Sequence, residues 1–177
     1  MRFAVLCPGP SLTRLWPGHI HLFDTTIAVN RAALAFQHDY LMMMDDNAIT
    51  ADVVSRASPR IGSLFPPHVQ HHADKAGWAN TNPRTLWPER KTLKKVSLTG
   101  PGAMLAAYKL GATHIGVFGN DMYGSTYFDG HEAYIYNGRR WSIEPLQWGM
   151  VTKYIQSLGV ECKFYRDRTG CLTITDI

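Results

Sequence analysis

The stretch Arg2-Phe-Ala-Val-Leu-Cys7, followed by Pro8-Gly9-Pro10-Ser11-Leu12, decides the fold that the sequence predicts. Apolar and small side chains dominate residues 2–7, as in a strand that is buried on both faces of a sheet. Proline and glycine then turn the chain. Ligands of open α/β sheets bind at the carboxyl ends of the strands. The turn at Gly9, Pro10 and Ser11 is therefore the first candidate for a phosphate or nucleotide site, and an ordinary Gly-Pro loop is the competing interpretation.

Strand-like and helix-like segments alternate along the rest of the chain. We expect further strands at 25–29, 40–44, 60–64, 114–118 and 160–165, and helices at 31–36, 49–57, 101–110 and 144–158, the last capped by Ser142. This alternation predicts an α/β fold: a single Rossmann-like domain with a mostly parallel sheet and helices on both faces. The chain has 177 residues, 45% of them hydrophobic, which suits one domain over residues 1–177.

Two stretches interrupt the alternation. Residues 65–95 are rich in Pro, His, Asn and Trp and are expected to form an irregular loop, of the kind that often serves as a lid or binding segment. Residues 119–141 contain Asn137-Gly138 between aromatic flanks, which predicts a short, lid-like hairpin insertion.

Charge and composition limit the partners. The net charge of +4 suits an anionic ligand, and because Lys and Arg form no dense stripe, nucleic acid is an unlikely partner. No apolar run approaches the roughly 18 residues of a membrane-spanning helix, and no secretory signal is visible. Three cysteines without metal-type spacing make a poor disulfide framework. We therefore expect a cytoplasmic protein.

Polar residues follow several of the expected strands. Asn30-Arg31, Asp45-Asp46-Asn47 and Gly119-Asn120-Asp121 each come directly after an apolar run, and Thr99-Gly100 opens a helix, where free N–H groups favour an anion. In a parallel sheet these loops share one edge, which predicts a nucleotide site there. Each residue taken singly also suits a turn or a helix cap.

Two clusters raise the question of a metal. Asp45 and Asp46 are weak candidates for holding Mg²⁺ against a pyrophosphate, the competing interpretation being an N-terminal cap for the helix at Ile49. His68-x-x-His71-His72-x-Asp74 has enough ligands for zinc, but no cysteine and no expected helix supports that interpretation.

Three motifs together resemble a known superfamily. They are Val5-Leu-Cys-Pro-Gly-Pro-Ser-Leu12, Ile27-Ala-Val-Asn30, and the segment from Leu98-Thr-Gly-Pro-Gly to Phe118-Gly-Asn-Asp-Met-Tyr123. Their order and spacing are similar to those of the small bacterial lipooligosaccharide sialyltransferases and of the related flagellin-modification and archaeal pterin pyrophosphokinase-like proteins. Those families share a strand followed by Gly-x-Gly-Pro-Ser-Leu, an Asn after the second strand, and a Thr-Ser-Gly helix that leads to a Gly-x-Asp loop.

The resemblance implies a Rossmann-like domain that holds a nucleotide by its phosphates and ribose. It implies that Gly9, Pro10 and Ser11 form the phosphate-side turn, and that Asn30 hydrogen-bonds the nucleotide or its sugar. It places Thr99 and Gly100 against base, ribose or phosphates, with Asp121 on the opposite loop.

The chain departs from the sialyltransferases at both ends of the site. Cys7 and Pro8 replace a Gly and an Asn of the first motif, and the place of the catalytic histidine before the last helix holds Arg139-Arg140-Trp141-Ser142. His131 is the alternative general base, because histidine titrates near neutral pH. Tyr123, with Tyr127 and Tyr134 as alternatives, and Arg140 are candidates to stabilise the departing phosphate.

These expectations combine into a nucleotide-binding transferase, most simply a glycosyltransferase that uses a CMP-sugar or a related nucleotide-activated sugar and needs no cofactor. Two alternatives stay open. One is a Mg²⁺-dependent pyrophosphoryl transferase, and the other is a non-catalytic, phage-type accessory protein that keeps the nucleotide fold without turnover.

Overall fold

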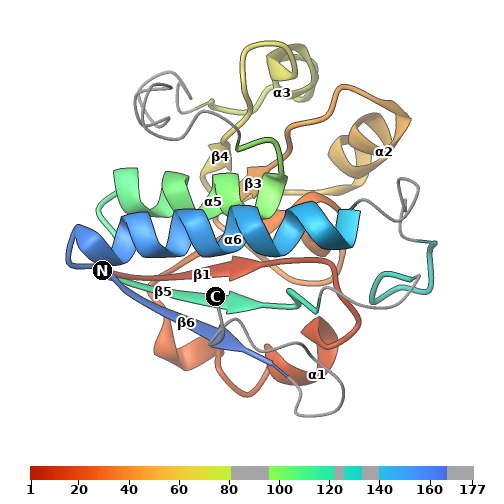
Figure 1. Ribbon diagram of the computed structural model, residues 1–177. Coiled ribbons are helices and arrows are strands. Elements are labelled where there is room, and N and C mark those ends of the chain that lie inside the picture. Colours follow the sequence, from red (N-terminus) through yellow and green to blue (C-terminus); the bar gives the residue numbers. More distant parts are fainter. Residues whose placement is uncertain (81–95, 122–125, 133–139, 167–177) are drawn as a thin grey trace.

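A six-stranded sheet forms the centre of the molecule (Figure 1). The computed structural model describes residues 1–80, 96–121, 126–132 and 140–166. In chain order the elements are β1 (Arg2–Leu6), α1 (Leu12–Leu15), η1 (Ile20–Leu22), β2 (Thr25–Val29), η2 (Asn30–Leu34), β3 (Tyr40–Met42), α2 (Ala48–Arg56), β4 (Gly62–Ser63), α3 (Gln70–Ala76), α5 (Thr99–Lys109), β5 (His114–Phe118), α6 (Arg140–Ser157) and β6 (Glu161–Tyr165), where η marks a 3₁₀ helix.

The strands lie in the order β4-β3-β2-β1-β5-β6, and every neighbouring pair is parallel. The α/β, Rossmann-like fold class is thereby confirmed. From β1 the chain builds outward through β2, β3 and β4, and then crosses to the other side of β1 for β5 and β6. The connections therefore reverse direction between β1 and β5. In open α/β sheets such a reversal opens a crevice at the carboxyl ends of the two strands.

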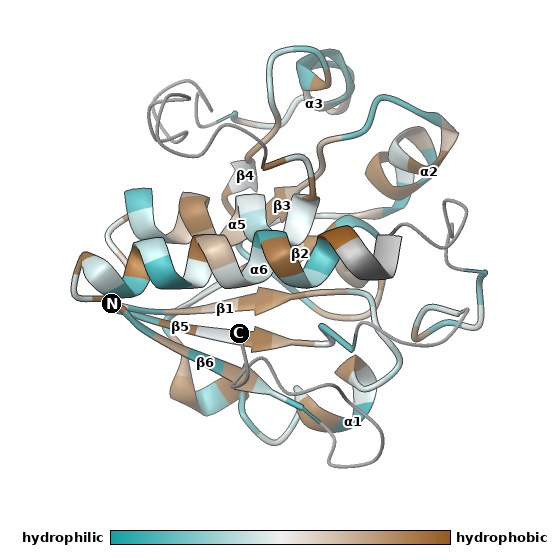
Figure 2. Ribbon diagram, in the orientation of Figure 1, coloured by the Kyte–Doolittle hydropathy of each residue, from teal (hydrophilic) through white to brown (hydrophobic). Residues whose placement is uncertain are grey.

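Two hydrophobic cores lie on opposite faces of the sheet. Phe3 and Val5 of β1 pack on the face that α5 and α6 cover, where Trp148 is also buried. Ala4 and Leu6 face the other core, which includes residues of α1, η2, α2 and α3. Alternation along a strand that is buried on both sides explains the nearly continuous apolar run of β1. Figure 1 shows α5 and α6 side by side over one face, and Figure 2 shows the apolar colour along β1 and also on parts of the helices, such as α1 and α6.

Several expected elements differ in extent. The expected helix at 31–36 is the 3₁₀ helix η2, and the expected strand at 60–64 shrinks to β4. The last helix begins at Arg140, so Ser142 is not its cap, and Pro145 lies inside it. Proline suits the first turn of a helix, whereas further in it removes one backbone hydrogen bond and its ring crowds the carbonyl one turn earlier. The burial of Trp148 and of Glu144 beside it favours the longer helix.

The expectation of an irregular loop over 65–95 is wrong for part of that stretch. Residues 70–76 form α3, which ends at Gly77 in the left-handed conformation, with φ at 69°. Such a glycine is a common helix terminator because it lacks a Cβ. The segments 81–95 and 133–139, which include the expected hairpin turn at Asn137-Gly138, lie outside the described residues. Within the described part of residues 119–141, one antiparallel bridge joins Thr126 to Glu132.

Candidate functional site

The loops after β1 and β5 are joined directly where the strand connections reverse. The Cys7 amide donates to the Phe118 carbonyl at 2.8 Å, and the Gly9 amide donates to the Gly119 carbonyl at 2.9 Å. A Cβ on Gly9 would lie 2.2 Å from the Gly119 oxygen and 2.6 Å from a carboxylate oxygen of Asp121. Close contact with the β5 loop therefore explains the glycine at position 9 without any phosphate.

Ser11 is held by Asp121. Its backbone amide donates to one carboxylate oxygen of Asp121 at 2.7 Å, and its hydroxyl donates to the other at 2.5 Å. Both side chains are buried, so these charge-assisted bonds connect the two loops where water does not compete. The structure thus brings these two predicted site residues together. It also commits the Ser11 donors to a carboxylate, so in this conformation they are not directed at a phosphate.

Asn30 and Arg31 follow β2 and play different parts. Asn30 has φ at 51°, the left-handed region that residues other than glycine occupy uncommonly. Arg31 is 6% exposed. Its guanidinium donates to one oxygen of Asp129 through Nε at 2.9 Å and through a terminal nitrogen at 2.5 Å, and it also reaches Asp52 at 3.4 Å. Arg31 therefore joins the end of β2 to the 126–132 segment and to α2.

His131 belongs to the same cluster. Its Nδ1 lies 3.2 Å from a guanidinium nitrogen of Arg31 and 3.4 Å from the carboxylate of Asp129, while 64% of its side chain is exposed. Burial alone would raise the pKa of the Asp129 carboxyl. The hydrogen bond and charge of Arg31 and the backbone N–H of His131 outweigh that effect and hold the pKa below its usual value. Asp129 is therefore ionised at neutral pH beside an imidazole.

Asn120 is the site residue that the motif analysis quoted in its loop but did not single out. It is 4% exposed, and its amide nitrogen has no hydrogen-bond partner within the described part of the chain. A buried donor without a partner costs about 1–3 kcal/mol, so such a group calls for an explanation. It directly precedes Asp121 at the carboxyl end of β5.

The amino end of α5 lies at the same edge of the sheet. A Cβ on Gly100 would lie 3.4 Å from the Cys7 sulfur and 2.4 Å from the indole ring of Trp148. Packing of Trp148 thus explains the glycine at position 100. Thr99 is 7% exposed, and Leu98, the N-cap residue, makes no side-chain cap. The expectation that the turn at residues 9–11 and the helix start share one edge is correct.

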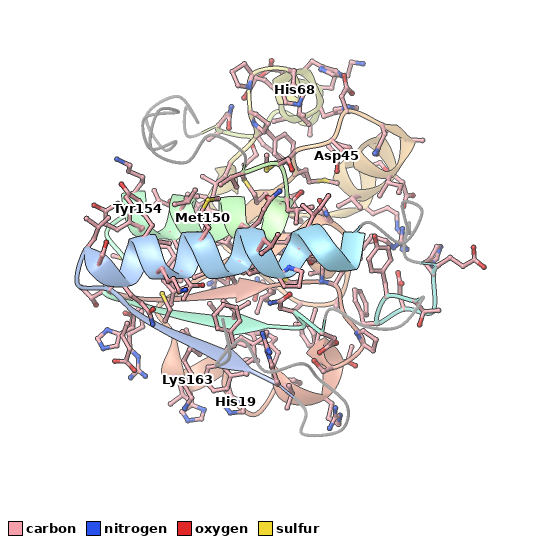
Figure 3. The ribbon with its side chains drawn as sticks, viewed as in Figure 1. His19, Asp45, His68, Met150, Tyr154 and Lys163 are labelled. Atoms are coloured by element: carbon pink, nitrogen blue, oxygen red, sulfur yellow. The ribbon has the colours of Figure 1, made fainter. Side chains whose placement is uncertain are left out.

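The loop after β3 is organised as a cap and a histidine cluster. Asn47 accepts from the Thr50 amide at 3.0 Å, which makes it the N-cap of α2, as the competing interpretation expected. The Asp46 carboxylate accepts from Nε2 of His72 at 2.9 Å. That hydrogen bond, followed by the charges of nearby histidines, lowers the pKa of Asp46. Asp45 is exposed, and Figure 3 shows it at the end of the molecule where α2 and α3 lie.

The side chains of two predicted catalytic residues, Tyr123 and Arg140, are not among those that the structure describes. Tyr123 lies outside the described residues, as does Tyr134. Arg140 is the first residue of α6, and its side chain is not among those described. Tyr127 is described, and its amide donates to the His131 carbonyl at 2.8 Å.

Comparison with known proteins adds no relative. No family model, no curated protein and no solved structure matches the chain. The resemblance to the sialyltransferase superfamily therefore rests on the three sequence motifs alone. None of the helices in the described ranges combines the length and hydrophobicity that a bilayer crossing requires.

Proposed function

We propose that this protein is a nucleotide-binding transferase and that it transfers a sugar from a nucleotide-activated donor of the CMP-sugar type. The nucleotide lies in the crevice between the carboxyl ends of β1 and β5, against Asn30, Thr99 and Asn120. Ser11 and Asp121 join the walls of this crevice rather than contacting the phosphate, because their polar atoms bond each other.

The observation that carries the proposal is the buried amide nitrogen of Asn120, which no described residue bonds, at the point where the strand connections reverse. A carbonyl of a base, a ribose oxygen or a phosphate oxygen would satisfy it. The amino end of α5 adds support, because the helix dipole favours negative charge there. Gln147 Oε1 accepts from the Ser97 and Leu98 amides, and the next two amides, those of Thr99 and Gly100, belong to the first turn of the helix.

His131 supplies the proposed general base. Arg31 can only donate, so the 3.2 Å contact between its guanidinium and His131 Nδ1 puts the ring proton on Nε2 in this conformation. To act as the base, the imidazole turns away from Arg31 and donates its Nδ1–H to Asp129, now 3.4 Å away, which leaves the lone pair on Nε2 for the proton of an acceptor hydroxyl. The bond broken is the one between the anomeric carbon and the nucleotide phosphate oxygen. The new bond joins the acceptor oxygen to that carbon, and the nucleotide leaves with the electron pair. Arg31 fixes the position of Asp129 through two hydrogen bonds.

The pyrophosphoryl-transfer alternative has less support. It requires Asp45 and Asp46 to present oxygens to Mg²⁺, and the Asp46 carboxylate instead lies against two histidine nitrogens. Mg²⁺ prefers oxygen ligands.

Thermal unfolding against CMP, UMP, GMP and ATP, each with and without Mg²⁺, tests the proposal. We expect CMP to raise the unfolding temperature without metal. Stabilisation only by ATP with Mg²⁺ would favour pyrophosphoryl transfer, and no stabilisation by any nucleotide would leave the accessory-protein alternative. For the catalytic step, His131→Ala should abolish hydrolysis of a CMP-sugar but keep CMP stabilisation. His114→Ala is the matched control, since His114 is an exposed histidine at the amino end of β5. Full donor hydrolysis by His131→Ala would remove His131 from the mechanism.

A further inference from the structure

Three side chains meet between α3 and the loop after β3. The carboxylate of Asp46 lies 2.9 Å from Nε2 of His72 and 3.6 Å from Nε2 of His71. One ligand atom from each of the three residues lies within 4.8 Å of the others. The two imidazole rings are neighbours, with centroids 4.1 Å apart, so their nitrogens converge on one carboxylate.

The cluster differs from the set of ligands that the sequence suggested. Asp74 accepts a hydrogen bond from Gln70 at 2.9 Å, and His68 donates to the Met44 carbonyl at 2.8 Å. Asp46 takes their place, from 26 residues before His72. Figure 3 shows His68 and Asp45, the neighbours of the cluster along the chain, at the same end of the molecule.

We propose that Asp46, His71 and His72 form a binding site for a nitrogen-preferring divalent cation of the zinc class, which fastens α3 to the loop after β3. Tetrahedral zinc with Zn–N and Zn–O bonds of about 2.0–2.1 Å holds its ligand atoms about 3.3 Å apart. The distances from the Asp46 carboxylate to Nε2 of His72 and to Nε2 of His71, 2.9 and 3.6 Å, lie on either side of that spacing. Binding replaces the proton of His72 Nε2 with the metal, and water completes the coordination.

The backbone on both sides of Asp46 is held in place. The Thr50 hydroxyl donates to the Asp45 carbonyl, and the Asn47 side chain caps α2 through the Thr50 amide. The two histidines are adjacent on α3, a helix that the sequence did not predict. Ligands on ordered elements keep their geometry, which favours binding. Two imidazoles and one carboxylate suit zinc, cobalt or nickel, whereas Mg²⁺ demands oxygen ligands. The proposal is independent of the proposed transferase function.

The test is calorimetric titration of the full chain, without a histidine tag, with Zn²⁺ and separately with Mg²⁺. The variants are Asp46→Asn, His71→Gln and their double variant. The replaced side chains of Asp46 and His71 are 48% and 46% exposed, so the variants should remain folded. Circular dichroism checks this. His114→Gln is the matched control, because His114 also lies close to a carboxylate, at 3.2 Å from Glu161, but has no second histidine in that pair.

We expect one Zn²⁺ per chain, with the affinity weakened about tenfold or more by each single substitution and unchanged in His114→Gln. Co²⁺ bound in place of zinc should give a visible absorption spectrum that the double variant lacks. The proposal is overturned if the wild-type chain binds no Zn²⁺, if the double variant binds it as tightly, or if Mg²⁺ binds with equal affinity.

Discussion

Replacing Gly9 with alanine separates a structural requirement for this glycine from a ligand-binding one. The φ of Gly9 is not positive, so alanine suits the backbone, and the contacts with Gly119 and with the Asp121 carboxylate oppose it. The new Cβ would lie 2.2 Å from the Gly119 oxygen, where real contacts are at least 3.0 Å, so the two loops must part by roughly 0.8 Å.

That movement stretches the 2.9 Å bond between the Gly9 amide and the Gly119 carbonyl beyond hydrogen-bonding range. It also strains the bonds between Ser11 and Asp121. A lost backbone bond costs about 1 kcal/mol, and a weakened bond to a buried carboxylate adds about 1.5–3 kcal/mol. We therefore expect Gly9→Ala to lower the free energy of unfolding by about 2.5–4 kcal/mol in the absence of any nucleotide.

Urea unfolding followed by circular dichroism measures this change. Gly18→Ala is the matched control, because Gly18 has a non-positive φ and its Cβ would meet only the Leu15 oxygen, at 4.0 Å. Alanine reduces the conformational entropy of the unfolded chain, so the control variant should be as stable as the wild type or more stable by up to about 1 kcal/mol. If Gly9→Ala is as stable as Gly18→Ala, the close joining of the β1 and β5 loops is refuted.

Three further predictions concern packing and titration. Gly100→Ala pushes a Cβ into the ring of Trp148 and should destabilise the protein by about 1–3 kcal/mol. Gly149→Ala on α6, whose Cβ would meet no atom within 4 Å among the described residues, should stabilise it by about 0.5–1 kcal/mol. Urea unfolding measures both changes. Burial lowers the pKa of His38, so below pH 6.5 the unfolded chain binds a proton that the folded chain does not, and stability falls as the pH drops. Unfolding at pH 7.5 and 5.5 should show this loss, and His38→Gln should reduce it. Burial raises the pKa of Cys162 to about 11, so alkylation at pH 8 should be about a hundredfold slower in the folded chain than in urea, as read by peptide mass spectrometry.

Each of these has a contradicting result. Equal stability of the two glycine variants would mean that Trp148 has room for a methyl group. An unchanged pH slope in His38→Gln would mean that the buried imidazole does not titrate differently on folding. Native alkylation of Cys162 at the unfolded rate would mean that its thiol is solvated.

The sheet was predictable because its strands are buried on both faces and read as continuous apolar runs. This signal identified β1, β2 and β5 to within about a residue. The two-residue strand β4 was expected to be longer, and the seven-residue helix α3 was expected to be a loop. Segments this short contain too few residues to show a clear hydrophobic period. Long-range packing, which no local pattern contains, defines them.

The candidate site was predictable in its place but not in its contacts. Loops that follow parallel strands share one edge, so residues from the β1, β2 and β5 loops do gather there. Which polar atom bonds which other depends on side-chain packing across about a hundred residues of chain, as in the pairs Ser11 with Asp121 and Arg31 with Asp129. For the same reason the sequence did not single out Asn120, and it grouped His71 and His72 with Asp74 rather than with Asp46.

The most direct test of the proposed nucleotide site is an amide NMR titration of the full chain with CMP in the absence of metal. The proposal predicts that the largest saturable shifts fall on Asn30, Thr99 and Asn120, while Thr113 and Gly159 at the opposite edge of the sheet stay unchanged. Shifts concentrated on Thr113 and Gly159, or no saturable shift with CMP, would contradict it.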